Sequence, residues 1–264
     1  RNALHNNQFV RQLINISNVM QLYNVSSYHS SALDVFQASP VIERVEQSDD
    51  DDNGDDYSDR IVKGLLKWFK EDFFKWVNKA DCIHCGNTNQ DKITALPAVR
   101  GYTGEHRQGQ AGIIEKYKCE ECGGVTEFPR FKNPEKLLTT RKGRCGEWND
   151  CFILILKSLG YNVRYIWNLE DHVWCEYYSK NLKRWIHLDS CENAFDNPML
   201  YNRGWGKRMS YVLAIHDSYI IDVSYKYIDS KSDKSIPRNK ITETDYQKVL
   251  AFITTTKLIK IQDD

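Results

Sequence analysis

Residues 144–190 read RCGEWNDCFILILKSLGYNVRYIWNLEDHVWCEYYSKNLKRWIHLDS and predict one helix followed by three strands. Apolar residues recur at three- and four-residue spacing after Cys145, which is typical of an amphipathic helix over residues 145–159. Gly160 supplies the expected C-terminal cap. Three short segments rich in Trp and Tyr then predict an antiparallel meander, namely VRYIWN, HVWCEYY and RWIHLDS.

Cys145 is the candidate nucleophile of this stretch. A catalytic cysteine needs a lowered pKa, a base, and a group that orients the base. Cys145 stands at the N-terminal edge of the predicted helix, where exposed N–H groups and the helix dipole favour thiolate, and Arg144 and Lys142 add positive charge. We expect Gly143 and Gly146 to let the backbone turn tightly and approach a substrate closely.

The base and its orienting group follow from strand geometry. If the second and third strands form a hairpin about residues 180–181, His172 lies directly opposite Asp189 on one face. The other face is expected to be the core side; it carries Val173, Cys175, Tyr177, Ile186 and Leu188. This register is an assumption, since a bulge would shift it. A lone Cys or His is more often structural, but three suitable residues at a helix start, a strand start and a strand end favour a triad.

Four of the eight cysteines form two pairs, Cys82-Ile-His-Cys85 and Cys119-Glu-Glu-Cys122. Each pair precedes a turn-prone Gly, and four thiolates in two such pairs predict a closed tetrahedral zinc site with a structural role. His84 is an alternative ligand that a complete set of four cysteines makes unnecessary. Two disulfides are disfavoured, because closely spaced pairs make poor structural disulfides and no export signal is visible. Cys151, Cys175 and Cys191 are expected to be buried or near the site.

Equal numbers of basic and acidic residues, 36 each, conceal one strongly acidic segment. Seven Asp lie between Asp49 and Asp59, and such a like-charge run predicts a solvated, disordered loop. A calcium-binding loop is disfavoured, because the Asp spacing is wrong and no Glu follows at the twelfth position. The rest of the chain is mildly basic.

Three further segments have helical periodicity: residues 7–23, residues 61–79 and the segment from Ile241 onward. The longest apolar run, Cys151–Leu156, is far shorter than the ~20 residues of a membrane helix. The sequence shows no leader peptide. Because it begins with Arg rather than Met, a leader that has been removed is an open alternative. Two glycosylation sequons, at Asn15 and Asn24, matter only in the secretory pathway and are discounted.

Three motifs resemble the triad motifs of the transglutaminase-like superfamily: GRCGEWNDCF, EDHVWCEYY and RWIHLDSCE. More narrowly, they resemble those of the cytosolic peptide:N-glycanases, in particular a fungal member. The resemblance extends to WFKEDFFKWVNKADCIHC, to the second cysteine pair, and to MSYVLAI and DVSYKY, so it covers about residues 61–227. Two cysteine pairs inserted before the catalytic cysteine separate this family from ordinary transglutaminases.

The resemblance implies an α+β fold. Its transglutaminase-like (papain-like) core would have an antiparallel β-sheet, a catalytic helix and an inserted four-cysteine zinc-binding subdomain. Accordingly, residues 60–81 and 130–240 would form the core and residues 82–129 the zinc-binding subdomain. An N-terminal helix and acidic disordered loop (residues 1–59) and a C-terminal helix (residues 241–264) would flank them.

The resemblance also implies an activity and a location. The enzyme would hydrolyse the amide bond between N-acetylglucosamine and the asparagine of misfolded N-glycoproteins, converting Asn to Asp in ER-associated degradation. Cys145 would attack the amide carbon to give a thioester, with His172 as base and then acid, and Asp189 would hold the imidazole. The expected location is the cytoplasm, with the nucleus as a second location.

Further residues are candidates by analogy with the family. The Cys145 N–H and the indole of Trp76 would meet the oxyanion, although Trp76, on a predicted amphipathic helix, is equally compatible with the core. Trp185 and Trp205 match aromatic positions that line the substrate groove. Arg164 and Glu192 are weaker polar candidates, for which a structural salt bridge is the better interpretation.

Partners and rival functions complete these expectations. In fungal relatives the terminal helices bind a proteasome-shuttle protein of the ubiquitin-receptor kind, so we expect such a partner, and neither nucleic acid nor a membrane span. One rival is a protein-crosslinking transglutaminase, which uses an amine in the second step and commonly needs calcium and accessory domains. The other rival is a non-catalytic zinc-bearing adaptor, which the complete triad argues against.

Overall fold

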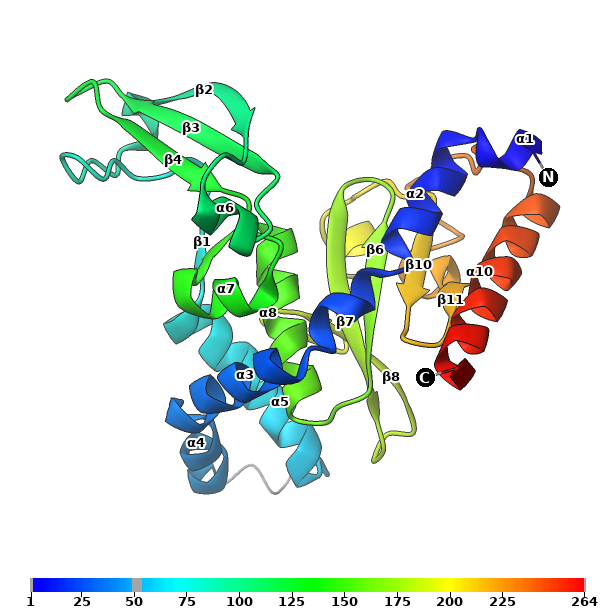
Figure 1. The fold of residues 1–264 in the computed structure, drawn as a ribbon. Coiled ribbons are helices and arrows are strands. Elements are labelled where there is room, and N and C mark those ends of the chain that lie inside the picture. The colour runs from blue at the N-terminus through cyan, green and yellow to red at the C-terminus, as the bar shows by residue number, and fades with distance from the viewer. Residues whose placement is uncertain (1, 49–53, 264) are drawn as a thin grey trace.

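The computed structural model describes residues 2–48 and 54–263, and it combines a helical layer with a six-stranded sheet (Figure 1). A separate three-stranded sheet stands at one end of the helical layer, and two terminal helices lie at the far side of the large sheet (Figure 1). This arrangement confirms the expected α+β class with an antiparallel sheet and a central helix. Within the described residues, the longest helices are too short or too polar to span a bilayer.

The six-stranded sheet has the order β11-β10-β6-β7-β8-β9, and every neighbouring pair is antiparallel. The three predicted strands are its centre: β6 (Val163–Asn168), β7 (His172–Ser179) and β8 (Arg184–Asp189). The outer strands are β9 (Ala194–Phe195), β10 (Val212–Ile215) and β11 (Ile220–Asp222). Both faces of β7 are covered, which explains why its sequence is apolar and aromatic on both sides.

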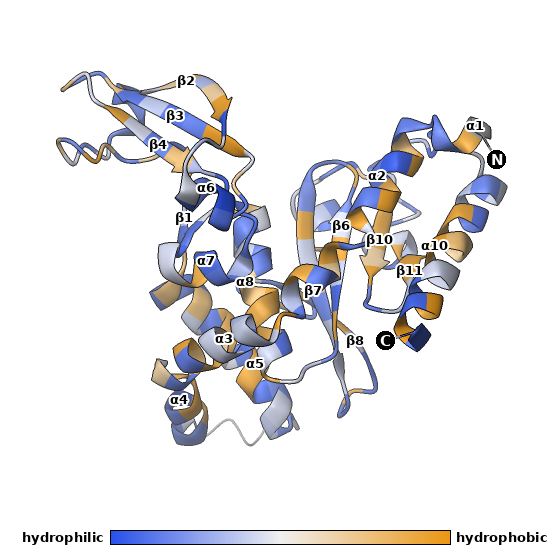
Figure 2. Cartoon of the chain, in the orientation of Figure 1, coloured by the Kyte–Doolittle hydropathy of each residue, from blue (hydrophilic) through white to orange (hydrophobic). Residues whose placement is uncertain are grey.

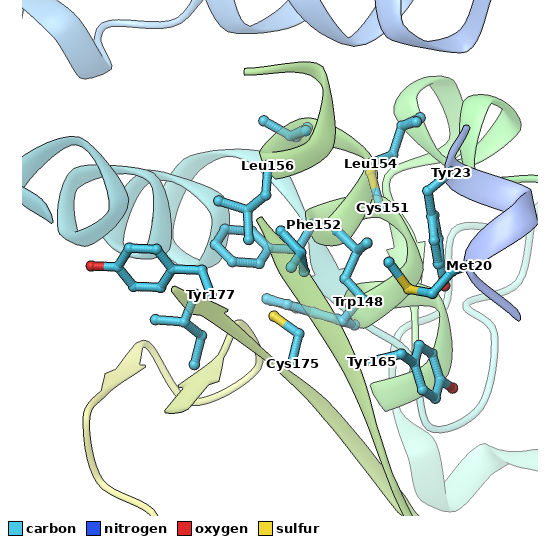
Figure 3. Packing of buried hydrophobic residues seen from close by; sticks show 14 of the residues in the cluster. Met20, Tyr23, Trp148, Cys151, Phe152, Leu154, Leu156, Tyr165, Cys175 and Tyr177 are labelled. Atoms are coloured by element: carbon cyan, nitrogen blue, oxygen red, sulfur yellow. The ribbon is translucent and has the colours of Figure 1, made fainter. Parts of the chain in front are cut away.

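The predicted helix after residue 144 is α8 (Cys145–Ser158), and it forms the middle of the core. All residues from Glu147 to Leu156 are buried, so this helix has no solvent face over that stretch. Figure 3 shows its side chains packed against labelled residues of η1 (Val19–Tyr23), β6 and β7. On the other side α8 contacts α3 (Ser26–Ala38) and α7 (Pro134–Thr140). Gly160 follows with a left-handed φ of 83°, as its predicted capping role requires.

The predicted helix over residues 61–79 is wrong in its second half. The helix α5 (Tyr57–Trp68) continues as a π-helical turn η3 (Phe69–Phe73), and the chain is extended from Phe74 onward. There β1 (Lys75–Trp76) pairs in parallel with β5 (Lys142–Gly143). The periodicity was misleading because Phe73 and Phe74 are both buried, whereas Trp76 in the strand is exposed.

Part of the acidic run is ordered, in contrast to the predicted loop; Asp49 to Asn53 lie outside the described residues. The side chain of Asp56 caps α5 by accepting from the N–H of Asp59. Asp59 itself is buried and accepts hydrogen bonds from Tyr177 at 2.5 Å and Ser179 at 3.0 Å. The end of this run is therefore part of the core, because hydrogen-bond donors on β7 compensate for the burial of a carboxylate.

The terminal segments meet at the β10–β11 edge of the large sheet (Figure 1). The predicted helix over residues 7–23 divides into α2 (Gln8–Ile16) and η1, after a short α1 (Asn2–His5). The predicted C-terminal helix is α10 (Glu243–Asp263), and a single turn α9 (Ser224–Tyr227) follows β11. The Phe9 ring of α2 lies 4.5 Å from that of Tyr211 and 6.0 Å from that of Tyr246 on α10. Apolar residues also remain exposed on α10 (Figure 2).

The three-stranded sheet comprises β2 (Ile93–Arg100), β3 (Ile113–Cys119) and β4 (Val125–Pro129), all antiparallel. The turn η4 (Gln90–Lys92) precedes it, and α6 (Gly104–Gln108) connects β2 to β3. The sheet has a small core of its own, made of Ala80, Ile93, Tyr117 and Phe128. We call residues 82–129 the four-cysteine subdomain. A remaining short helix, α4 (Val41–Gln47), packs on α5.

Candidate active site and metal centre

Cys145 is the first residue of α8, as the sequence predicts. Arg144 before it is extended, and its backbone N–H donates to the Glu147 carboxylate at 3.2 Å, which fixes the first turn. The Trp148 indole donates to the Gly143 carbonyl at 3.1 Å and ties the same turn to the preceding strand β5. Cys145 is partly exposed, whereas the residues from Glu147 to Leu156 are buried. The thiol therefore lies where a rigid helix end meets solvent.

His172 lies between Cys145 and Asp189. Its Nε2 is 3.1 Å from Asp189 Oδ2, so the interaction with the Cys145 thiol that raises the pKa of His172 is left to the other ring nitrogen, Nδ1. Burial alone would lower the pKa of His172, but the hydrogen bonds and charges of Asp189 and Cys145 raise that pKa to about 9. The structure thus brings the three predicted triad residues together, and the arrangement favours a protonated imidazole at neutral pH.

The predicted pairing of β7 with β8 is wrong by two residues, although the shared face is correct. Leu188 pairs with Cys175, and His187 pairs with Glu176, so His172 lies beyond the paired segment. The connecting turn runs over residues 180–183, longer than assumed, and Lys183 has a left-handed φ of 54°. Because side chains alternate with a period of two, a shift of two residues keeps His172 and Asp189 on one face.

The carboxylate of Asp189 is buried and accepts three hydrogen bonds. Its Oδ1 accepts from the Cys191 N–H at 2.9 Å, and its Oδ2 accepts from His172 and from the Tyr201 hydroxyl at 2.7 Å. Burial opposes ionisation, but the bonds from His172 and Tyr201 lower the pKa of Asp189. The carboxylate is therefore held ionised and in one orientation beside the imidazole.

Two residues of the site, Tyr201 and His187, were not predicted. The Tyr201 hydroxyl also lies 2.7 Å from Nε2 of His187. His187 lies on the same face of β8 as Asp189, which the alternation of side chains along a strand predicts for residues two apart. Tyr201 precedes Trp205 by four residues, a spacing that one helical turn brings together. Both aromatic residues belong to or flank the π-helical turn η5 (Leu200–Gly204).

Trp205 and Trp76 both lie near the triad. Trp205 contacts the His172 ring, and Trp76 lies in a strand that pairs with the residues just before Cys145. The Trp205 ring is 5.3 Å from the His172 ring, and 46% of this residue is exposed. Trp76 pairs with Gly143, two residues before Cys145, and is 48% exposed, so it is not a core residue of a helix. Its indole N–H donates to Asn78 Oδ1 at 2.7 Å.

The other predicted substrate residues lie near the two ends of β8. Trp185 is the second residue of β8, near the end opposite Asp189, and the Arg164 guanidinium lies 4.2 Å from its ring. Arg164 is buried in an ion pair with Glu176, the structural alternative that the sequence favoured. Glu192 is exposed just beyond Asp189, where its N–H donates to the Asp189 carbonyl at 3.3 Å.

The four predicted cysteine ligands form one cluster at the tip of the four-cysteine subdomain. The Sγ atoms of Cys82, Cys85, Cys119 and Cys122 all lie within 4.8 Å of one another. Two matching turns produce this arrangement, since the Gly86 N–H donates to the Cys82 carbonyl and the Gly123 N–H to the Cys119 carbonyl. Both glycines have left-handed φ angles, 76° and 73°, that other residues rarely adopt. The cluster is therefore shaped to hold one metal ion.

The alternatives for these cysteines are not supported. His84 Nε2 lies 3.0 Å from the Val125 carbonyl, so this ring is engaged with backbone outside the sulfur cluster. All eight cysteines are unpaired by disulfides. Donors also point at the sulfur atoms: the Gly124 N–H lies 3.3 Å from Cys122 Sγ and the Asn87 amide 3.5 Å from Cys119 Sγ. Such donors stabilise thiolates, the form that binds metal.

Comparison with known proteins identifies families and structures that are similar to this chain. The family model described as the transglutaminase-like superfamily matches residues 98–190, and the Rad4 transglutaminase-like domain matches residues 168–264. Crystal structures of Rad4–Rad23 share the fold; the complex bound to a 6-4 photoproduct UV lesion has a TM-score of 0.54 at 13% identity. That match covers 100% of this chain and 59% of the other.

Curated relatives are much more similar in sequence, and those named here are all called peptide-N(4)-(N-acetyl-beta-glucosaminyl)asparagine amidase. The Saccharomyces cerevisiae protein is 44% identical over 100% of this chain and 73% of its own length. The Kluyveromyces lactis protein is 42% identical over 99% of this chain and 73% of its own length. The Rattus norvegicus protein is 41% identical over 73% of this chain and 29% of its own. The chain therefore belongs to the peptide-N(4)-(N-acetyl-beta-glucosaminyl)asparagine amidases, an enzyme family with the transglutaminase-like fold.

Proposed function

We propose that this chain cleaves the glycosylasparagine amide bond through a triad of Cys145, His172 and Asp189. The observation that carries the proposal is the position of His172, whose Nε2 lies 3.1 Å from Asp189 Oδ2 and whose pKa is raised by both Asp189 and Cys145. A buried imidazole between a thiol and a carboxylate is the arrangement required for nucleophilic amide hydrolysis. The family relationship supports the same reaction.

The proposed reaction has two halves. First, the Cys145 thiolate attacks the side-chain amide carbon, and protonated His172 gives its Nδ1 proton to the departing nitrogen. The amide C–N bond breaks, so the glycan leaves as a glycosylamine and a thioester remains. His172, now neutral, then accepts a proton from water as that water attacks the thioester. The C–S bond breaks, which releases aspartate and restores the thiolate–imidazolium pair. The pKa of about 9 for His172 supports its role as acid in the first half.

The oxyanion needs donors that point at the site before reaction. The backbone N–H of Cys145 is in the first turn of α8, where N–H groups have no partner within the helix. We infer that the Trp76 indole is the second donor, since β1 holds it beside Gly143. In the structure this N–H bonds to Asn78, so substrate binding must exchange that hydrogen bond.

The exposed rings supply surfaces for the glycan. Trp205 lies against His172 and is the better placed of the two predicted rings to receive the sugar attached to the reacting asparagine. Trp185 and Glu192 would act farther along the bound substrate, and Arg164, buried in its ion pair with Glu176, would act only by packing against the Trp185 ring. We further infer that the substrates are misfolded N-glycoproteins and that the enzyme works in ER-associated degradation in the cytoplasm.

We infer that the four cysteines hold one structural Zn²⁺. Four sulfur ligands suit zinc and leave no open coordination position, so the metal would supply folding energy rather than chemistry. The four-cysteine subdomain contacts the start of α8 through Glu115 on β3, so a disordered subdomain would also disturb Cys145.

A ubiquitin-receptor protein of the proteasome-shuttle kind remains the proposed partner of the terminal helices. Two observations support it. Apolar residues are exposed on α10, among them Phe252, Leu258, Ile259 and Ile261. Rad4, whose fold is similar, is described in complex with Rad23.

The decisive test is mass spectrometry of a denatured high-mannose glycopeptide treated with wild-type protein and with Cys145→Ala. The wild type should release the glycan and leave Asp in place of Asn, and Cys145→Ala should do neither while it retains its melting curve and metal. Cys191→Ala is the matched control, because the hydrogen bond from Cys191 to Asp189 comes from its backbone N–H, which the change retains. Undiminished deglycosylation by Cys145→Ala contradicts the triad. Incorporation of a labelled amine into a glutamine substrate would instead indicate crosslinking.

A further inference from the structure

The triad carboxylate is the end of a longer chain of hydrogen bonds. Asp189 Oδ2 is 2.7 Å from the Tyr201 hydroxyl, which in turn is 2.7 Å from Nε2 of His187. All three residues are at most 1% exposed, so water does not compete for these bonds. The proposed reaction uses Asp189 directly but gives no role to the other two residues.

The donor and acceptor roles in this series of hydrogen bonds are fixed by one backbone amide. The Asn197 N–H lies 3.2 Å from Nδ1 of His187, and an amide N–H can only donate. Burial lowers the pKa of His187 to about 4, so at neutral pH the ring is neutral and carries its proton on Nε2. Nε2 therefore donates to the Tyr201 oxygen. The Tyr201 proton is then directed to Asp189, since an ionised carboxylate only accepts.

The Tyr201 ring also contacts the groups around the reacting centre. Its centroid lies 5.0 Å from the His172 ring, 4.2 Å from the Trp174 ring and 5.0 Å from the Trp205 ring. The turn η5 is π-helical, with the Trp205 N–H donating to the Leu200 carbonyl five residues earlier, which places Tyr201 and Trp205 side by side. One side chain therefore touches the base, the carboxylate and the exposed aromatic ring.

We propose that Tyr201 is a positioning residue of the amidase reaction and that His187 sets the direction of its hydroxyl. With two donors on Oδ2 and one on Oδ1, the Asp189 carboxylate cannot rotate without losing a hydrogen bond. Its fixed plane keeps Nδ1 of His172 directed at Cys145. This inference rests on the proposed function, because it assumes that Asp189 orients the catalytic base.

Tyr201→Phe tests the inference, since it keeps the ring and removes only the hydroxyl. Loss of one hydrogen bond to a charged group predicts a kcat lower by about 10- to 100-fold, with KM changed less than about two-fold. His187→Leu should give a similar loss of kcat, whereas His187→Gln, which retains an N–H donor, should restore part of it. Because both residues act through one bond, the double variant Tyr201→Phe/His187→Leu should lose less than the product of the single effects.

Tyr246→Phe is the matched control. It removes a comparable hydrogen bond, from a buried Tyr hydroxyl to Asp222 at 2.6 Å, at the other edge of the sheet. If Tyr201→Phe and Tyr246→Phe have equal kcat values, and Cys145→Ala is inactive in the same assay, the inference is overturned. Activity of Cys145→Ala would overturn the proposed function itself. If Tyr201→Phe does not fold, equal kcat values for His187→Leu and His187→Gln overturn the inference, and partial rescue by His187→Gln supports it.

Discussion

Arg144 and Glu115 form a two-pronged ion pair between the residue that precedes Cys145 and the central strand of the three-stranded sheet. The Nη1–Oε2 distance is 3.0 Å and the Nη2–Oε1 distance is 2.6 Å. Arg130 extends the network, because it bonds to Glu115 at 2.9 Å and to Glu147 at 3.2 Å. Burial opposes ionisation of Glu115, but Arg144, Tyr117 and Arg130 lower its pKa to about 2. The four-cysteine subdomain is therefore electrostatically joined to both sides of the first turn of α8.

Glu115→Gln should lower both the activity of the enzyme and its stability. The change removes the negative charge that two arginines share, so Arg144 beside Cys145 loses its ion pair and keeps its hydrogen bonds to the Val77 and Asn78 carbonyls and the Tyr117 hydroxyl. We expect kcat to fall by about ten-fold and the free energy of unfolding by roughly 1–3 kcal/mol. Urea unfolding and steady-state kinetics measure both quantities. Glu105→Gln is the control. The Glu105 side chain is 62% exposed, so its ion pair with Lys136 contributes little to the free energy of unfolding. Equal kcat values in the two variants would contradict a role for this network in positioning Cys145.

Metal removal should unfold the four-cysteine subdomain and, through the same network, reduce activity. Cys82→Ser and Cys119→Ser, or treatment of the wild type with a chelator, should lower both the melting temperature and the rate of deglycosylation. Elemental analysis should find one zinc per wild-type chain. Cys175→Ala, a buried thiol outside the cluster, should keep its zinc. Lost activity with an unchanged melting curve would argue against a structural metal.

The His172–Asp189 pair should stabilise the fold mainly at mildly acidic and neutral pH. His172 has a folded-state pKa of about 9, above the value of about 6.5 for a free imidazole. The proton is thus bound more tightly in the folded state. The stabilisation is complete below pH 6.5 and is lost as the pH rises toward 9, by roughly 3 kcal/mol. Asp189→Asn should remove most of this dependence. Unfolding free energies at pH 6 and pH 9 for both proteins test it, and the prediction fails if their pH slopes are equal.

Gly143 and Gly146 should respond oppositely to Ala, although both were expected to permit a tight turn. Neither has a left-handed φ. A Cβ on Gly143 would lie 2.4 Å from Cβ of Glu147, whereas a Cβ on Gly146 meets nothing within 4 Å. Gly143→Ala should therefore displace Glu147 and cost more than about 1 kcal/mol, and Gly146→Ala should stabilise α8 by up to about 1 kcal/mol. Thermal unfolding compares them. A rise in KM for Gly146→Ala would indicate close approach of the substrate there.

Local sequence patterns were sufficient for the parts of the site that depend on periodicity. The start of α8 at Cys145 and the left-handed Gly160 after it follow from helical spacing and capping. The sulfur cluster follows from the spacing of the two cysteine pairs. The shared face of His172 and Asp189 survives a register error, because alternation depends only on whether the shift is even.

Contacts between segments distant in the chain could not be predicted in this way. Residues 74–76 have apolar periodicity that fits a helix, but pairing of β1 with β5 makes them extended. Tertiary hydrogen bonds of this kind override local propensity. Tyr201 is another example, because its role depends on a π-helical turn that brings its hydroxyl to Asp189 from twelve residues away.

The parallel pairing of β1 with β5 has a consequence for how the length of this chain can change. Lys75 lies beside Lys142 and Trp76 beside Gly143, so the two ends of the segment 77–141 are held together, and within it Leu137 and Leu138 of α7 pack in the main core. Once the ends of such a loop are held together, doubling its length costs only about 0.6 kcal/mol of closure entropy. Insertions or deletions at the distal turns of the loop are therefore expected to leave the position of Cys145 unchanged, provided that Glu115 and Arg130 still reach α8.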